Sequence, residues 1–225
     1  MTSRISIVMP VLNEAGSIAE TLRALAGCRC AGAELLLVDG GSDDATLRAA
    51  AGLADQLLDA PRGRARQMNA GAARARGEVL LFLHADTMLP DDALAAIVKT
   101  IDSGARWGRF DVTISGSSAM FPLIAALMNR RSRWSGIATG DQAMFVRRDT
   151  FEQVGGFPDQ PLMEDIELSR RLRRLARPAC LRARVITSGR RWERFGIWRT
   201  ILLMWRLRLL YWLGAPAERL AKAYR

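Results

Sequence analysis

Three aspartates stand where a folded chain could deliver them to one reaction site: Asp39, Asp86 and Asp165. Asp39 directly follows the mostly apolar run 34–38, and Asp86 closes the stretch 79–86. Short apolar runs of this kind are typical of strands buried on both faces of a parallel sheet. Because open α/β sheets bind ligands at the carboxyl ends of their strands, we expect both carboxylates at that edge. A carboxylate held there suits a metal ion bound to phosphates, although an aspartate after a strand can also be only a helix cap.

Strands and helices that could position these residues alternate along the first part of the chain. Ser17 and Glu20 have the spacing of a capping box at the start of a helix. A second helix is expected over 64–76, and glycines in the loop 39–46 allow a tight turn. The expected strands are 5–9, 34–38, 56–58 and 79–83. This order predicts an α/β sandwich of the doubly wound, Rossmann-like type with a mostly parallel central sheet.

The pattern changes after Pro90. Residues 109–114 alternate like a strand exposed on one face, and residues 119–128 are apolar and precede a basic stretch. Glu167 is expected to pair with Arg171 on the surface of a helix that opens near Met163. The remaining elements expected here are a helix over 92–101, a strand over 142–146 and a helix over 148–154.

Composition points to a folded protein with an anionic partner. The 225 residues fit one large domain, and the net charge of +10 is nearly all arginine, since Lys99 and Lys222 are the only lysines. Arginine excess fits phosphate-bearing substrates, anionic lipid or nucleic acid, but it can also reflect genomic base composition. Three scattered cysteines predict reduced thiols, and we expect neither a secretory signal nor a membrane-spanning segment.

The C-terminal stretch 197–213 is apolar almost all round. On a helical wheel one narrow arc holds Trp198, Ile201, Leu202, Trp205, Leu209 and Trp212. Arg199, Arg206 and Arg208 lie on its flanks. This arrangement is typical of a helix lying in the plane of a membrane surface. The alternative is a helix packed across the domain or at a homodimer interface.

Three strand ends together could hold a nucleoside diphosphate. Asp39 can accept hydrogen bonds from a base or ribose, the loop 62–64 offers two arginines to phosphate, and Asp86 can bind a metal that faces the diphosphate. Each signal alone is weak, and their combination in one chain is what favours this interpretation.

With these residues in place, the chain resembles a family 2 glycosyltransferase of the GT-A fold, in a compact bacterial subgroup. The motifs that carry the resemblance are Pro10-x-x-Asn13-Glu14, Val38-Asp39-Gly40-Gly41-Ser42-x-Asp44-x-Thr46, Gly63-Arg64 with Asn69-x-Gly71, Leu83-His84-Ala85-Asp86, Gly155-Gly156-Phe157 and Glu164-Asp165. They run in the family's order from about residue 5 to 175. The resemblance implies a GT-A domain over 1–190, with a nucleotide-sugar-binding half (1–90) and an acceptor half (91–190). A basic, Trp-rich helical extension follows over 191–225.

The resemblance also implies roles for single residues. Asp86 matches the last aspartate of the D-x-D motif, a ligand of the metal and the diphosphate, and Asp165 matches the catalytic base. Glu164-Asp165 would also suit a helix start without any catalytic role. The donor side would comprise Pro10, Asn13, Glu14, Asp39, Gly40, Arg64, Asn69, Asp86 and Arg191. The acceptor side would comprise Gly140, Asp141, Glu164 and Trp192.

Two motifs depart from the family pattern. His84, the only histidine, occupies the first D-x-D position, where it could bind the metal, bond to ribose or be a plain polar residue. Ser188-Gly189-Arg190-Arg191-Trp192 resembles the Q-x-x-R-W motif of processive relatives, with serine in place of glutamine. Arg191 would face the diphosphate and Trp192 the acceptor, but polymer synthesis is not expected.

The sequence therefore predicts an inverting, metal-dependent glycosyltransferase. Its donor would be a nucleotide-sugar, with UDP-sugar favoured by family likeness, and its cofactor Mn²⁺ or Mg²⁺. We expect a lipid-linked or amphipathic acceptor, peripheral contact through 197–213 with the cytoplasmic face of the plasma membrane, and no nucleic acid. The alternatives are a nucleotidyltransferase of similar architecture and a non-catalytic basic protein that binds membranes. The first expects a basic, Gly-rich loop that 10–16 lacks, and the second expects the strand-end carboxylates to be lost.

Overall fold

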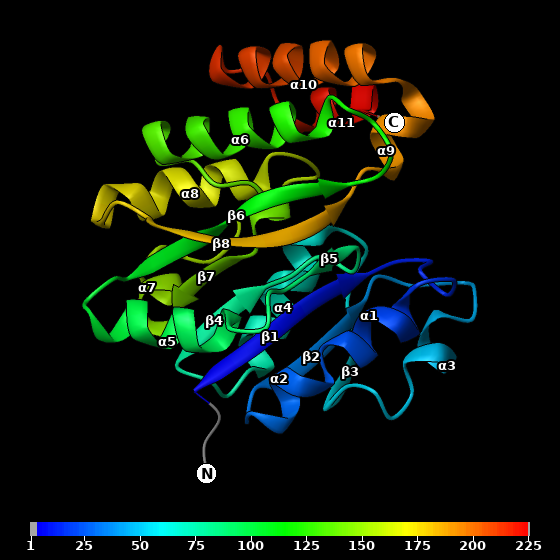
Figure 1. Ribbon diagram of the computed structural model, residues 1–225, viewed down its shortest axis with the longest axis vertical. Coiled ribbons are helices and arrows are strands. Elements are labelled where there is room, and N and C mark those ends of the chain that lie inside the picture. Colours follow the sequence, from blue (N-terminus) through cyan, green and yellow to red (C-terminus); the bar gives the residue numbers. More distant parts are fainter. Residues whose placement is uncertain (1–3, 225) are drawn as a thin grey trace.

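The computed structural model describes residues 4–224. Its centre is an eight-stranded sheet with the strand order β3-β2-β1-β4-β7-β6-β8-β5 (Figure 1). The strands are β1 (Ile5–Val11), β2 (Glu34–Asp39), β3 (Gln56–Asp59), β4 (Val79–Phe82), β5 (Thr87–Met88), β6 (Trp107–Ser115), β7 (Met144–Arg147) and β8 (Ala179–Ser188). The four strands of the first half pair in parallel, as predicted.

The second half joins the first through an antiparallel pair, β4 with β7. Strand β7 also runs antiparallel to β6, whereas β6 and β8 are parallel, and β5 pairs antiparallel with β8. Four of the seven strand pairings are thus parallel, which confirms the mostly parallel sheet. The predicted α/β sandwich is confirmed as well.

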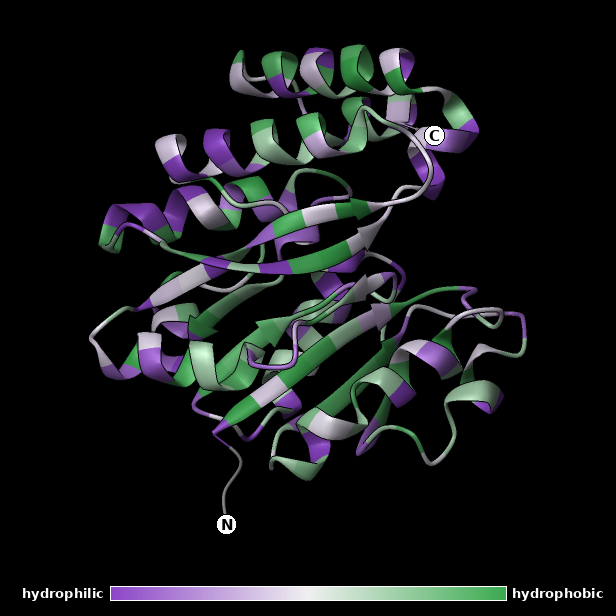
Figure 2. Cartoon of the chain, in the orientation of Figure 1, coloured by the Kyte–Doolittle hydropathy of each residue, from purple (hydrophilic) through white to green (hydrophobic). Residues whose placement is uncertain are grey.

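Helices cover both faces of the sheet (Figure 1). They are α1 (Ile18–Ala24), α2 (Ala26–Cys30), α3 (Thr46–Ala50), α4 (Arg64–Arg74), α5 (Ala93–Asp102), α6 (Phe121–Ser135), α7 (Arg148–Gln153), α8 (Glu164–Leu175), α9 (Arg190–Phe195), α10 (Ile197–Trp212) and α11 (Ala217–Tyr224). Along β1, Ile7 and Met9 enter one core cluster, and Val8 enters the other. This alternation is what a strand with helices on both sides requires, and Figure 2 shows the strands as largely hydrophobic.

Several expectations about local structure were wrong. Ser17 does not form the capping box, because its hydroxyl donates to Glu14 Oε2 at 3.2 Å. Strand β6 is buried on both faces up to Val112, since Arg109 is neutralised inside by Asp111. The strand expected over 142–146 begins two residues later, after a 3₁₀ turn at Gly140–Gln142.

Other features were confirmed or had not been foreseen. Glu167 pairs with Arg171 at 3.4 Å and also with Arg170 at 3.3 Å. The three cysteines are free thiols. Most of the apolar segment 119–128 lies in α6, which begins at Phe121 and continues through the basic stretch. Strands β5 and β8 were not predicted, and the helical extension expected over 191–225 divides into α9, α10 and α11. The beginning of the chain, Met1–Ser3, lies outside the described residues.

The C-terminal helices form a third, small core. Leu207 of α10 and Leu220 of α11 are buried against Met163, the residue before α8. Most of the arc predicted from the helical wheel faces away from this core: Trp198, Trp205 and Trp212 are 68%, 67% and 78% exposed. Ile201, which was predicted to share the arc, instead packs against the first core cluster. None of the helices between residues 4 and 224 is long and apolar enough to cross a membrane.

Candidate functional site

Asp39 ends β2 at the carboxyl edge of the sheet and shapes the loop that follows it. Its Oδ2 accepts the backbone N–H groups of Gly41 (3.0 Å) and Ser42 (2.8 Å), and its Oδ1 accepts the Ser42 hydroxyl (2.5 Å). Gly41 has φ +87°, a conformation that glycine adopts without a steric penalty. Asp39 is therefore buried and fixed, and the loop 40–44 presents backbone groups at the sheet edge.

The loop after β1 interlocks with this loop. Asn13, in the left-handed region at φ +55°, accepts the Asp43 N–H at 3.0 Å, and its own N–H donates to Ser42 Oγ at 2.9 Å. The Glu14 N–H donates to Thr46 Oγ1 at 2.8 Å. Pro10 itself is buried within β1. Pro10, Asn13, Glu14, Asp39 and Gly40 are thus brought together, as the sequence predicted.

Gln67 is a residue of this edge that sequence reasoning missed. Its buried amide donates to the carbonyl oxygens of Val11 and Val38, both at 2.8 Å, and so joins the ends of β1 and β2. A Cβ added to Gly40 would lie 3.0 Å from this amide, which explains the glycine there. The signal was a polar residue on the buried side of the predicted helix 64–76, between Arg64 and Asn69.

Asn69 connects the two halves of the molecule rather than lying open at the edge. Its amide donates to the Phe157 carbonyl at 2.8 Å and accepts the Phe157 N–H at 3.0 Å. Gly156 has φ +68°, and a Cβ there would come within 2.8 Å of Asn69 Oδ1. Two motifs that are 88 residues apart thus form one structural unit.

Asp86 and His84 follow β4 but face different partners. Asp86 is half-buried, and among the described residues its carboxylate has one long contact, 3.5 Å from the Thr87 hydroxyl. The His84 ring lies against Gly140, and its Nδ1 is 3.6 Å from Asp141 Oδ1. Within residues 4–224, no three His, Cys, Asp or Glu side chains cluster as a complete metal site. An uncommitted carboxylate fits a metal held by one or two carboxylates together with substrate phosphates, as Mg²⁺ often is.

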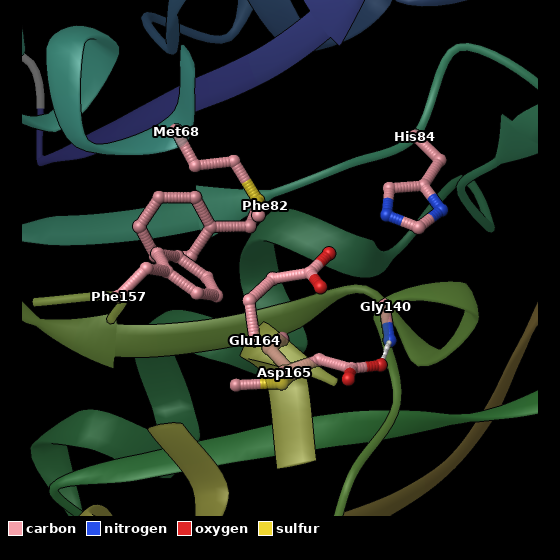
Figure 3. Close-up of a pocket in the computed structure, with 8 residues that line it drawn as sticks. Met68, Phe82, His84, Gly140, Phe157, Glu164 and Asp165 are labelled. Atoms are coloured by element: carbon pink, nitrogen blue, oxygen red, sulfur yellow. Dashed lines mark hydrogen bonds between the residues drawn. The ribbon is translucent and has the colours of Figure 1, made fainter. Parts of the chain in front are cut away.

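A pocket lies where β4, the 3₁₀ turn and the start of α8 meet (Figure 3). One wall is apolar and the other carries the polar groups His84, Gly140, Glu164 and Asp165. The apolar wall consists of Met68, Phe82, Met144 and Phe157. Figure 3 shows the carboxylates of Glu164 and Asp165 directed toward the side on which His84 and Gly140 lie.

Helix α8 places its first two residues in this pocket. Asp165 Oδ2 accepts the Gly140 N–H at 2.8 Å, and Oδ1 accepts the Ile166 N–H at 2.7 Å. Burial raises the pKa of Asp165, against these hydrogen bonds, and the charge of Asp141 adds to the rise. Burial and then the charge of Asp165 raise the pKa of Glu164. A carboxylate with a raised pKa is a stronger base than an ordinary aspartate, which suits proton abstraction.

Cations compensate this acidic cluster. Desolvation lowers the pKa of Arg64, but the charges of Glu164, Asp141 and Asp165 outweigh it, so the pKa is raised. Desolvation would raise the pKa of Asp141, whereas His84, Arg64 and Arg131 lower it overall. Arg64, expected on the donor side, thus interacts with Asp141 and Glu164, expected on the acceptor side, and with Asp165, expected as the base.

Arg131 was missed. Burial lowers the pKa of Arg131, its main attraction is to Asp165, and its buried Nε and Nη2 have no hydrogen-bond partner among the described residues. The sequence shows it only as one of three arginines in a basic stretch. Which of them points inward depends on the register of α6, and that register became clear only with the start of the helix at Phe121.

Arg191 and Trp192 are residues of α9, and of the two only Arg191 is linked among the described residues to the acidic cluster, through Tyr224. The Arg191 guanidinium stacks on the Tyr224 ring, 3.7 Å from its centroid, and donates to the Tyr224 carbonyl at 2.8 Å. Trp192 packs against the first core cluster. Helix α11 thus covers Arg191 in this structure.

Solved structures with the same fold include a complex with UDP and a complex with GDP-Man. S. aureus TarS in complex with UDP has a TM-score of 0.66 and 18% identity, covering 82% of this chain and 60% of that one. The mannosyltransferase PcManGT from Pyrobaculum calidifontis, in complex with GDP-Man and Mn²⁺, has a TM-score of 0.66 and 21% identity, covering 92% and 61%. At these identities the likeness establishes the fold alone.

Relatives that are similar in sequence are transferases. A PGL/p-HBAD biosynthesis glycosyltransferase of Mycobacterium tuberculosis is 32% identical over 173 residues, which cover 68% of this chain and 62% of the relative. An undecaprenyl-phosphate 4-deoxy-4-formamido-L-arabinose transferase of Klebsiella pneumoniae is 30% identical over 161 residues, covering 64% and 48%. The chain thus spans only about half to three fifths of the length of these relatives. Residues 6–155 match the model of glycosyl transferase family 2, and the chain belongs to that family.

Proposed function

We propose that the protein transfers a sugar from a nucleotide-sugar donor to an acceptor hydroxyl with inversion at the anomeric carbon. The observation that carries this proposal is the placement of Asp165, which α8 holds in the pocket next to the end of β4. A single displacement needs a base on the acceptor side and a group that stabilises the departing diphosphate. Asp165 would be the base, and Asp86, a half-buried carboxylate after β4, would act on the diphosphate through a metal.

The donor would lie along the edge formed by the loops after β1, β2 and β4. The fixed loop at Asp39 and Gly40 supports a nucleoside site, with the Asn13-Glu14 loop beside it. Arg64 supplies a cation for the diphosphate, and Arg191 a second one once it leaves Tyr224. Asn69 acts indirectly, by holding the Phe157 turn that lines the pocket.

Asp86, assisted by His84, would hold a divalent metal, Mn²⁺ or Mg²⁺. When bound, such an ion neutralises charge that develops on the departing diphosphate. Asp165 takes the proton of the acceptor hydroxyl. At the same time the hydroxyl oxygen bonds to the anomeric carbon, and the bond between that carbon and the diphosphate breaks. Its raised pKa favours this transfer, and the Gly140 and Ile166 N–H groups orient the carboxylate.

The acceptor would be lipid-linked, at the cytoplasmic face of the plasma membrane. Support comes from the undecaprenyl-phosphate transferase among the relatives and from the exposed tryptophans of α10. Glu164, Asp141, Gly140 and Trp192 would shape the acceptor side. For the donor we favour a UDP-sugar, as with the UDP complexes of fold neighbours, while the GDP-Man complex makes GDP-sugars the main alternative.

The test is a screen of nucleotide-sugar hydrolysis with Mn²⁺, because it requires no knowledge of the acceptor. We expect one UDP- or GDP-sugar to be cleaved clearly faster than the others. Transfer to the acceptor, once identified, should fall at least ~100-fold in Asp165→Asn, in line with the usual contribution of a general base. Donor binding, measured by calorimetry, should stay within about two-fold, because Asp165 makes no donor contact in this mechanism.

Two results would contradict the proposal. Near-normal transfer by Asp165→Asn would show that Asp165 is not the base. A wild-type protein that binds and cleaves no nucleotide-sugar with Mn²⁺ or Mg²⁺, but binds lipid, would instead indicate a non-catalytic member of the family.

A further inference from the structure

Helix α10 exposes a continuous apolar stripe on the side opposite its packed face. Its members recur at intervals of three and four residues, so they share one side of the helix. They are Trp198 (68% exposed), Leu202 (65%), Trp205 (67%), Leu209 (56%) and Trp212 (78%). Exposed tryptophans at this density mark an interaction surface rather than ordinary scatter of apolar residues.

Helix α6 exposes a second stripe. Leu123, Leu127 and Trp134 are 52%, 55% and 84% exposed and share one helix side, opposite the buried Phe121, Ile124 and Ala125. Figure 1 shows α10 running alongside α6, and Ile197 and Ile201 of α10 pack against the same core cluster as α6. The two stripes therefore belong to neighbouring helices, and Figure 2 shows hydrophobic residues along both.

The charge of the two helices is entirely positive. Neither α6 nor α10 contains an aspartate or glutamate, and each contains three arginines. Arg130, Arg199 and Arg206 are exposed. Within the described residues, none of these three has a carboxylate within ion-pair distance. An apolar stripe with free arginines beside it matches apolar acyl chains beneath anionic headgroups.

We propose that α6 and α10 together form a docking surface for an anionic lipid bilayer. This inference deepens the proposed function, on which it rests for the lipid-linked acceptor, by naming the partner and adding α6 to the contact expected through 197–213. The inner face of α10 packs on Met163, next to Glu164 and Asp165. Docking through α10 would thus hold the acceptor half of the site against the membrane that supplies the acceptor.

Vesicle co-sedimentation of the full chain tests the surface. The probes are vesicles of phosphatidylcholine alone and of phosphatidylcholine with an equal amount of phosphatidylglycerol. We expect tight, salt-sensitive binding only to the anionic vesicles. Trp205→Ser with Leu209→Ser on α10, and Leu127→Ser with Trp134→Ser on α6, should each weaken binding at least ~10-fold. Arg199→Gln and Arg206→Gln should each cost roughly five-fold, because an arginine near an anionic surface contributes about that factor.

The matched control is Leu57→Ser on β3, 42% exposed, which should bind like wild type. The inference is overturned by equal binding to both kinds of vesicle, by unchanged binding in either double variant, or by a stable dimer that the α10 changes dissociate while no vesicle binding occurs. Nucleotide-sugar hydrolysis without vesicles separates the two proposals, since every variant should keep it. Its absence in wild type contradicts the enzyme, and its presence without vesicle binding contradicts only the docking surface.

Discussion

Gly140 and His84 are in such close contact that a single methyl group would separate them. A Cβ at Gly140 would lie 2.4 Å from His84 Cε1 and 2.5 Å from Nε2, and the same glycine donates its N–H to Asp165. Gly140→Ala must therefore shift the ring or the 3₁₀ turn. We expect at least a ~10-fold loss of transfer, because small displacements of a positioned base are costly.

Gly16→Ala is the control for this change. A Cβ at Gly16 meets no atom within 4 Å, so activity and unfolding should match wild type. Steady-state transfer rates of the two variants, compared with their urea unfolding, decide the matter. An unaffected Gly140→Ala enzyme would mean that His84 and the Gly140 turn play no part in the reaction.

Glu164 should make the protein less stable at neutral pH than at mildly acidic pH. Burial and the charge of Asp165 raise its pKa, so the folded state binds its proton more tightly than the unfolded state. The folded state is then favoured below the unfolded pKa, and this stability is lost as pH rises through the folded pKa.

Glu164→Gln removes the free-energy cost of burying the charged carboxylate. Urea unfolding at pH 7 should find the variant more stable than wild type, with the difference shrinking toward pH 4. If Glu164→Gln were as stable as wild type at both pH values, the Glu164 charge would be well compensated in the folded state.

At the scale of elements, Met163 connects the C-terminal helices with the site, because it packs against them and directly precedes Glu164. It has φ +65°, which costs about 1–2 kcal/mol for a residue with a Cβ, and it is 6% exposed. Leu207 and Leu220 bury its side chain, so the packing of α10 and α11 supports the turn that aims Glu164 and Asp165.

Leu207→Ala should therefore affect both stability and catalysis. Loss of this buried side chain should cost about 2–5 kcal/mol, and kcat should fall with little change in the donor KM, because the acceptor half loosens. Leu202→Ala on the same helix, 65% exposed, should change the free energy of unfolding by less than ~0.5 kcal/mol. Equal unfolding curves for the two variants would refute the role assigned to Leu207.

Elements with a strong local signal could be predicted from the sequence. The apolar runs of β1, β2 and β4 are continuous because helices cover both faces, and their ends carried Asp39 and Asp86 to the expected edge. Strand β8 was missed because Arg182 and Arg184 interrupt it, and its pairing with β6 is formed over a long sequence separation. The side on which the α10 tryptophans lie depends on what its opposite face meets, namely Met163, and no local pattern records that contact.

The candidate site was predictable in its donor half and less so elsewhere. Asp39, Gly40 and Asn13 interact within two neighbouring loops, so their motifs describe the geometry directly. Gln67 and Arg131 matter through contacts with distant backbone or charges, which only the folded chain brings together. Asn69 belonged to a correct motif, but its partner, Phe157, became known only from the structure.

The whole molecule is two half-sheets joined at β4 and β7, and the donor would bind at the edge beside this junction. A ligand that binds only the folded state raises stability by mass action, about 2.7 kcal/mol at a hundred times its Kd. For a chain of this size that corresponds to a rise in Tm of roughly 5–10 °C. We expect UDP or GDP to produce this shift with Mn²⁺ and to lose most of it in EDTA or in Asp86→Ala, because the metal links the carboxylate to the diphosphate. Asp159→Ala, which removes only an exposed ion pair with Arg66, should keep the shift. A nucleotide shift that is the same with and without metal would exclude Asp86 as the anchor of the diphosphate.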